Sequence, residues 1–105
     1  MPSIIADRGI ITQINVFDVL PENQDALVAL LKEAAQSVRD IPGLMSASLH
    51  RSLDGSRVVN YAQCETMQSW EAVMRRLREH GFLERSKRLA TANPGLYEVV
   101  YTLAT

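Results

Sequence analysis

The sequence predicts an α+β protein in which four strands alternate with two main helices. Its composition, 47% apolar and 22% charged, is typical of a globular domain. Two segments repeat apolar residues every three or four positions, as amphipathic helices do. Four others have strand-like alternation or β-branched and aromatic residues, with turn signals near their ends. A chain of 105 residues is long enough for one core but short for two. We therefore expect a single domain over residues 1–105.

The chain begins with a predicted strand and a predicted helix. Residues 10–18 are rich in β-branched and aromatic side chains and predict the strand. Asn23 is expected to cap the helix, which spans 26–38. The apolar stripe of this helix consists of Leu27, Leu30, Leu31, Ala34 and Val38. Pro42 and Gly43 are expected to stop the helical segment.

A β-hairpin is predicted next, over Leu44–Arg51 and Arg57–Cys64, with Asp54 and Gly55 forming its turn. In its first strand, one face is expected to carry Met45, Ala47 and Leu49, and the other Ser46, Ser48 and His50. In its second strand, one face is expected to carry Val58, Asn60, Ala62 and Cys64, and the other Val59, Tyr61 and Gln63. His50 is expected opposite Asn60.

The remaining third of the chain predicts two helices and a strand. Thr66 is expected to cap a helix that ends at Gly81. Its apolar stripe consists of Trp70, Val73, Met74 and Leu77. A shorter helix is predicted over 82–90. The turn signal of residues 93–95, Asn-Pro-Gly, then predicts a final strand over 96–103.

This order of elements is typical of a ferredoxin-like βαββαβ fold with an antiparallel sheet. The helices of such a fold cover one face of the sheet and leave the other bare. Here the bare face would carry Val59, Tyr61, Gln63 and their neighbours, and apolar surface of that extent favours a partner. We therefore expect a homodimer in which two sheets pack face to face.

Several classes of function are disfavoured by composition and motifs. The net charge of −1 argues against a nucleic-acid clamp, and no apolar run approaches the roughly 20 residues that span a membrane. Residues 1–8 lack the pattern of a signal peptide, so we expect a cytoplasmic protein. With one cysteine and two histidines we expect neither a disulfide nor a metal site. No nucleotide or flavin motif is present, so we expect no cofactor.

Asn60 is the most informative position, because it shares its predicted face with Val58 and Ala62, toward the helices. A buried amide needs hydrogen-bond partners, and an Asn bonded to nearby backbone is one interpretation. The other is a donor that points into a cavity and holds an enolate or carbonyl oxygen of a ligand.

Other candidates have both structural and functional interpretations. Cys64 is expected to be a small core residue. Trp70 either packs in the core or lines a pocket for a flat aromatic ligand. Residues 75–88 carry six basic and two acidic side chains, which predicts a solvated helix surface. Within this segment, Arg85 or Arg88 could instead stand at a pocket mouth and hold an anionic or phenolic group.

The sequence around the hairpin resembles the antibiotic biosynthesis monooxygenases. The likeness rests on Asp54–Gln63, which reads DGSRVVNYAQ, and on Ile41–Leu44, and it extends from about Ile11 to Tyr101. The resemblance implies a dimeric α+β barrel. It also implies oxidation of anthrone-type polyketides to quinones with O₂ and without a cofactor. Asn60 matches the asparagine of the family's pocket.

Three positions depart from the polyketide-oxidising members of that family. Cys64 stands where those members have Trp, and Trp70 and Leu49 stand where they have Tyr. The pocket would therefore lack hydroxyl and indole groups that bond the substrate. Related haem-degrading enzymes need a His on the short helix, and residues 82–87 contain none, which disfavours haem.

We expect a cofactor-independent monooxygenase that acts on an aromatic polyketide-like or quinol substrate, with Asn60 stabilising the oxyanion. The predicted substrate-binding residues are Trp70, Cys64, Leu49, Met74, Phe82, Arg85 and Arg88. The alternative is a non-catalytic dimeric protein that binds a small apolar ligand in the same pocket. A protein that binds a partner through its basic surface is a third hypothesis.

Overall fold

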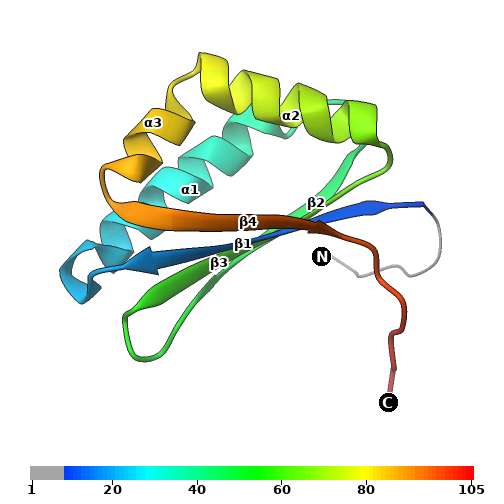
Figure 1. Cartoon of the computed structure of the whole chain (residues 1–105). Helices are drawn as coiled ribbons and strands as arrows, with labels where there is room; N and C mark the ends of the chain where they lie inside the picture. Colours follow the sequence, from blue (N-terminus) through cyan, green and yellow to red (C-terminus); the bar gives the residue numbers. More distant parts are fainter. Residues whose placement is uncertain (1–8) are drawn as a thin grey trace.

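The computed structural model of the protein describes residues 9–105, which form a four-stranded antiparallel sheet with the helices packed on one face (Figure 1). The elements are β1 (Ile11–Val19), η1 (Pro21–Asn23), α1 (Gln24–Val38), β2 (Leu44–Arg51), β3 (Arg57–Cys64), α2 (Met67–Glu79), α3 (Phe82–Lys87) and β4 (Ala90–Tyr97). The strand order is β2-β3-β1-β4. The ferredoxin-like α+β fold is therefore confirmed. None of the helices within residues 9–105 is long and apolar enough to cross a membrane.

The expectation about a signal peptide concerns residues 1–8, which lie outside the described part of the chain. The assignment of residues 1–105 to a single domain stays a prediction.

The entry into α1 differs from the prediction. The helix begins at Gln24, and Asn23 forms no side-chain cap. Asn23 has nearly helical backbone angles (φ −104°, ψ −5°), because the 3₁₀ turn of η1 leads directly into α1. A capping side chain normally projects from extended backbone. The backbone N–H of Asn23 instead donates to the carbonyl of Leu20 at 2.8 Å.

The hairpin of β2 and β3 has the predicted bounds but contains a β-bulge. Leu44 pairs with Cys64 and Ser46 with Gln63, so Met45 is the extra residue of the bulge and does not share a regular face with Ala47. Leu49 therefore lies opposite Asn60. The expectation that His50 would lie there is wrong, because the bulge sets the register and places His50 opposite Val59.

The two ends of α2 follow the prediction. The backbone N–H of Ser69 donates to Oγ1 of Thr66 at 3.1 Å, which confirms the cap. Gly81 follows the helix with φ +78°, a left-handed conformation in which glycine is favoured. The next helix, α3, ends at Lys87 rather than at Ala90, because the chain already enters β4 at Ala90.

The final strand was predicted too late in the chain. Residues 93–95 are part of β4 and do not form a turn, and residues 98–103 lie beyond the strand. The Asn-Pro-Gly sequence fits there because β4 is an edge strand, where proline is tolerated. Asn93 also reinforces the pairing, since its side-chain amide donates to the carbonyl of Val16 at 3.0 Å.

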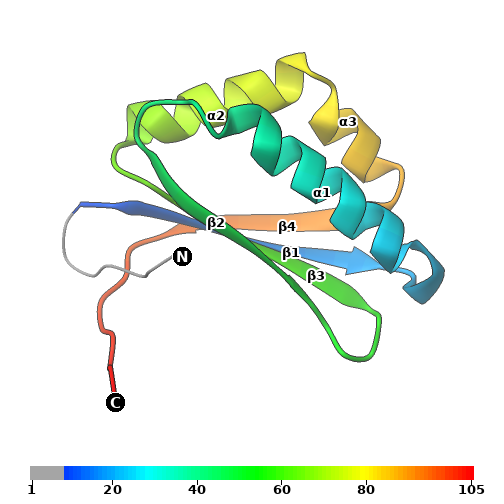
Figure 2. The same ribbon diagram turned by 180° about the vertical axis from the view of Figure 1, so that it is seen from behind.

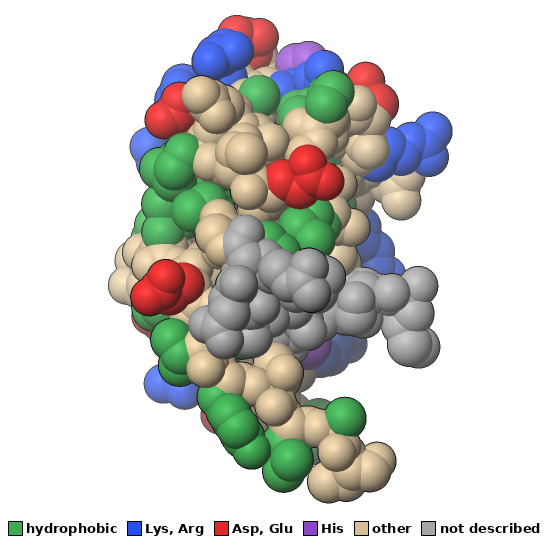
Figure 3. Space-filling model, turned by 90° about the vertical axis from the view of Figure 1, so that its right-hand side faces the viewer, with side chains coloured by type: hydrophobic (Ala, Val, Ile, Leu, Met, Phe, Trp, Pro, Cys, Tyr) green, Lys and Arg blue, Asp and Glu red, His purple; other side chains and the backbone are tan. Residues whose placement is uncertain are grey.

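Beyond Tyr97 the chain leaves the sheet on the side opposite the helices (Figure 1). Val100, Tyr101 and Leu103 are each 73% exposed, and hydrophobic side chains of this tail stand out at the lower end of the molecule in Figure 3. The main core lies instead between sheet and helices. It is centred on Phe17, Leu27 and Val58, and Figure 2 shows α1 crossing this side of the sheet.

Candidate active site

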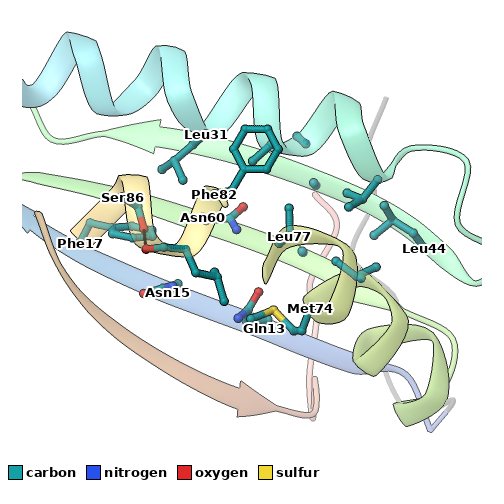
Figure 4. A pocket seen from close by; sticks show the side chains of 17 residues that line it. Gln13, Asn15, Phe17, Leu31, Leu44, Asn60, Met74, Leu77, Phe82 and Ser86 are labelled. Atoms are coloured by element: carbon teal, nitrogen blue, oxygen red, sulfur yellow. Dashed lines mark hydrogen bonds between the residues drawn. The ribbon is translucent and has the colours of Figure 1, made fainter. Parts of the chain in front are cut away.

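A cavity of about 80 Å³ lies between the sheet and the three helices. Its walls are mostly apolar, and Figure 4 shows the lining side chains converging from both layers. The lining residues are Gln13, Asn15, Phe17, Leu31, Ala34, Ala35, Val38, Leu44, Ala47, Asn60, Ala62, Val73, Met74, Leu77, Phe82, Leu83 and Ser86. None of these side chains is charged at neutral pH. The cavity therefore offers an apolar environment to a ligand.

The strands supply the carboxamide groups of the cavity. Gln13 and Asn15 project from β1 and Asn60 from β3, so three side-chain carboxamides share the floor (Figure 4). Two of them are direct neighbours, because Asn15 and Asn60 pair across the two strands. Side chains in such a pair have Cβ atoms about 4.5–5.5 Å apart. One ligand oxygen can therefore contact both amides.

The hydrogen bonding of Asn15 determines which end of its amide is free. Its Oδ1 accepts the backbone N–H of Asn93 on β4 at 3.1 Å. The oxygen of the amide is thereby engaged, and the Nδ2 group remains to donate. An amide fixed in this way presents N–H to the cavity, which suits a ligand oxygen that carries negative charge.

Asn60 lies where the sequence predicts it, on the cavity side of β3. Its side chain has no hydrogen-bond partner among residues 9–105, and the same holds for Gln13, which is only 8% exposed. The interpretation of Asn60 as a core amide bonded to nearby backbone is therefore not supported. Asn60 is half-buried and Gln13 is buried, and both amides are available to form hydrogen bonds with a ligand in the cavity.

Of the residues on α2 and α3 that are predicted to bind substrate, two line the cavity. Met74 of α2 and Phe82 of α3 line the cavity. Trp70 does not, because it lies one turn before Met74, near the start of α2. It packs there against the core cluster that contains Val38 and Cys64.

Cys64 and Leu49 are also outside the cavity lining. Cys64 is 2% exposed in the same core cluster as Trp70, and burial raises the pKa of its thiol. It is thus the small core residue that the sequence predicts. Leu49 lies opposite Asn60 but on the outer strand β2, from which only Leu44 and Ala47 reach the cavity.

Arg85 and Arg88 do not stand at the cavity mouth. They face a shallow groove between α1 and α3, on the other side of the short helix from Ser86. Arg85 pairs with Glu33 at 3.4 Å, and its guanidinium carbon lies 5.4 Å from the ring centre of Phe82. Arg76 of the same basic segment pairs with Asp40, so this surface is partly neutralised.

Gln13, Asn15 and Ser86 are cavity residues that the sequence analysis did not single out. In residues 11–17, polar side chains alternate with Ile14 and Val16, a pattern that normally turns the polar side toward water. Phe17 gives the contrary signal, because it shares a face with Gln13 and Asn15 and is buried. Within residues 9–105, no group of three His, Cys, Asp or Glu side chains is placed to hold a metal ion.

The fold and the cavity define a ferredoxin-like protein with a mostly apolar cavity between its sheet and helices, into which three carboxamides project. The sequence profile of the antibiotic biosynthesis monooxygenase family matches residues 10–77, more than half of the chain. The chain belongs to this family of monooxygenases.

Individual relatives agree with this assignment. The chain is 31% identical over 103 residues to tetracenomycin-F1 monooxygenase of Streptomyces glaucescens, covering 97% of this chain and 92% of the relative. The monooxygenase ActVA-Orf6 of Streptomyces coelicolor, solved in complex with nanaomycin D, is 28% identical with a TM-score of 0.80, covering 93% of this chain and 94% of that one. SnoaB, a cofactor-independent oxygenase from Streptomyces nogalater, shares the fold at 21% identity with a TM-score of 0.77, covering 92% and 99% of the two chains.

Proposed function

We propose that this protein is a cofactor-independent monooxygenase that oxidises a hydroxylated aromatic compound, polyketide-like or a quinol, with O₂. The observation that carries the proposal is the pair Asn15 and Asn60 on the floor of an apolar cavity. In such surroundings an N–H donor interacts strongly with an oxyanion, because little water competes for it.

The chemistry needs no group beyond the substrate and O₂. A phenolic ring system with an adjacent CH₂ loses a proton and becomes an electron-rich enolate. The enolate passes one electron to O₂, and the resulting carbon radical and superoxide combine to form a C–O bond. The O–O bond of this peroxide then breaks, so that one oxygen stays as a carbonyl and the other leaves as water with the two hydrogens of the CH₂. A quinol has no CH₂ and reacts at a ring C–H instead, so that quinol and O₂ give a hydroxyquinone and water. Asn60 and Asn15 stabilise the enolate oxygen throughout.

The absence of charged side chains from the described cavity lining restricts the substrate. No Asp, Glu, His, Lys or Arg contacts the cavity, so the substrate must ionise by its own acidity once its oxyanion is stabilised. This favours quinols and hydroxylated anthrone-type rings over simple ketones. A volume of about 80 Å³ also means that a ligand of several rings displaces flexible side chains such as Met74 and Leu83.

We infer that two copies of the chain form a dimer through the sheet face opposite the helices. That face carries Ile14 and Val16 of β1 with Val59 and Tyr61 of β3, all half-buried in the single chain. The Oε1 atom of Gln63 is buried beside them without a partner among residues 9–105, while its Nε2 donates to Thr12. Light scattering after gel filtration should give the mass of two chains. Val59→Asp should give the mass of a single chain. Gln68→Asp, at an exposed position of α2, should still give the mass of two chains.

Oxygen consumption tests the enzymatic proposal. Wild-type protein stripped of metals with EDTA is mixed with an anthrone and with a naphthalene quinol, and O₂ uptake is followed with an electrode. We expect uptake with one O₂ consumed per carbonyl formed on the anthrone, and its loss in Asn60→Ala. Tight binding of both compounds with no uptake above the protein-free rate would instead favour a non-catalytic binding protein.

A further inference from the structure

We propose that Gln13 is a specificity-determining residue that bonds a second oxygen of the aromatic ligand, on the far side of the ring from the oxygen held by Asn15 and Asn60. This inference rests on the proposed function and adds the substitution pattern of the substrate. The ligand it selects carries two oxygen substituents on opposite sides of one six-membered ring, as a quinol does. An anthrone acquires the second oxygen only when it is oxidised, so the inference favours the quinol among the proposed substrates.

The first argument is the unpaired state of a buried side chain. Gln13 is 8% exposed, lies on β1 opposite Ala62 and lines the cavity. Figure 4 shows its carboxamide rising into the cavity beside Met74. No residue within 9–105 forms a hydrogen bond with it, and its amide atoms are not among the fully enclosed unpaired atoms, so they are accessible from the cavity. A polar group of a ligand would satisfy this amide.

The second argument is spacing. Gln13 and Asn15 are two residues apart on the same face of β1, so their Cα atoms are separated by about 6.6 Å along the strand. The amide pair Asn15 and Asn60 therefore forms one polar point and Gln13 a second. That separation suits two oxygens attached across a single ring that lies along β1 under Met74 and Leu77.

The third argument is the chemistry of the side chain. A carboxamide both donates and accepts, so Gln13 can accept from a hydroxyl of the reduced ligand and donate to a carbonyl of the oxidised one. The walls near it are apolar, so a ligand without the second oxygen leaves the amide unpaired. A site of this kind discriminates strongly against the analogue that lacks the polar group.

A pair of small phenols tests the proposal directly. Naphthohydroquinone has hydroxyls on opposite sides of one ring, and α-naphthol lacks one of them. Their dissociation constants are measured without oxygen by fluorescence quenching on the full chain. We expect the wild type to bind naphthohydroquinone at least about 10-fold more tightly than α-naphthol. Gln13→Met should bring the ratio close to one by weakening naphthohydroquinone alone.

Controls separate this role from a structural one. Gln13→Leu repeats the test with another apolar shape, and the ratio of affinities does not depend on the fraction of protein that is folded. Gln24→Met removes another buried glutamine, whose amide bonds to the carbonyls of Ser52 and Arg57 away from the cavity, and should leave the ratio unchanged. A ratio unchanged in both Gln13 variants, or equal weakening of both ligands, would overturn the proposal.

The result also distinguishes this inference from the proposed function. If selectivity depends on Gln13 but no oxygen is consumed, the inference stands and the oxygenase proposal fails. If neither phenol binds the wild type, the inference is overturned, and oxygen uptake with the anthrone decides the proposed function separately.

Discussion

Asn15 of β1 and Asn60 of β3 lie directly opposite each other in the sheet, and both side chains reach the same cavity. The backbone of β4 contributes to this arrangement, because the N–H of Asn93 occupies Oδ1 of Asn15. Three adjacent strands thus cooperate to present amide N–H groups to one point. The amide of Asn15 is held in place before a ligand arrives, and we expect a ligand oxygen to draw the amide of Asn60 to the same point, an arrangement that stabilises developing charge.

Removal of either amide should slow turnover. We expect Asn60→Ala and Asn15→Ala each to lower kcat for O₂ consumption about 100-fold, as loss of one oxyanion donor typically does. The double variant should lose less than the product of the two effects, because both act on one oxygen. Asn23→Ala is the matched control, since Asn23 lies at the start of α1, outside the cavity lining. Full activity in both single variants would contradict the assigned role.

The two expected helix caps should differ in their effect on stability. Thr66→Ala should lower the free energy of unfolding by about 1 kcal/mol, because Oγ1 of Thr66 accepts the N–H of Ser69. Asn23→Ala should change it by less than about 0.5 kcal/mol, because Asn23 makes no such bond. Urea unfolding followed by circular dichroism measures both. Equal losses in the two variants would show that the cap geometry is wrong.

Alanine at Gly43 should be far more harmful than alanine at Gly81. Both glycines have positive φ, at +92° and +78°, so either substitution costs about 1–2 kcal/mol of backbone strain. At Gly43 the new Cβ would also lie 1.9 Å from Oγ and 2.7 Å from Cβ of Ser69, so β2 and α2 must move apart. At Gly81 nothing lies within 4 Å. Thermal melting should show the larger drop in Tm for Gly43→Ala, and a larger drop for Gly81→Ala would refute the argument.

The hairpin turn should contribute to acid sensitivity. Asp54 accepts hydrogen bonds from the hydroxyl of Ser56 at 2.7 Å and its backbone N–H at 2.9 Å, and these bonds lower the pKa of the carboxyl to about 2. The folded state therefore favours the carboxylate. The resulting stabilisation is complete above the ordinary pKa of 3.8 and is lost as the pH falls from there toward 2.

Asp54→Asn should reduce this pH dependence. Between about pH 6 and about pH 2.5 the free energy of unfolding should fall less in the variant than in the wild type. The difference is measured by urea titration at each pH. Asp40→Asn should remove a separate part of the pH dependence of the free energy of unfolding, since the hydrogen bond from Arg76 also lowers the pKa of Asp40. Parallel pH profiles for wild type and Asp54→Asn would rule out the contribution of the turn.

The order of elements could be predicted from the sequence because strands, helices and most turns have local signals. The position of β4 could not be predicted, since Asn-Pro-Gly by itself indicates a turn. These residues form part of a strand only because they pair with β1. The Met45 bulge is likewise a property of the pairing between strands. Both errors arise where contacts distant in sequence override local preference.

A residue of the candidate site could be predicted where the alternation within a single strand shows which face its side chain lies on, as for Asn60. Helical periodicity identifies a stripe but not how far along it a cavity extends, so it could not show that Trp70 and Arg85 lie outside the cavity lining. Asn15 could not be predicted in this way, because Ile14 and Val16 on the opposite face of β1 make its own face look like the one exposed to water. Only the alignment of β1 with β3 shows that the amides of both strands converge.

The place of Pro94 in β4 has a consequence for how the protein behaves when it is concentrated. An edge strand with a full row of free N–H and C=O groups invites stacking of one sheet onto the next and growth into fibres. Pro94 removes one donor from this edge, and the Met45 bulge interrupts the opposite one. Growth of the sheet from one chain to the next is thereby discouraged at both edges, and the dimer that we propose uses the face of the sheet instead.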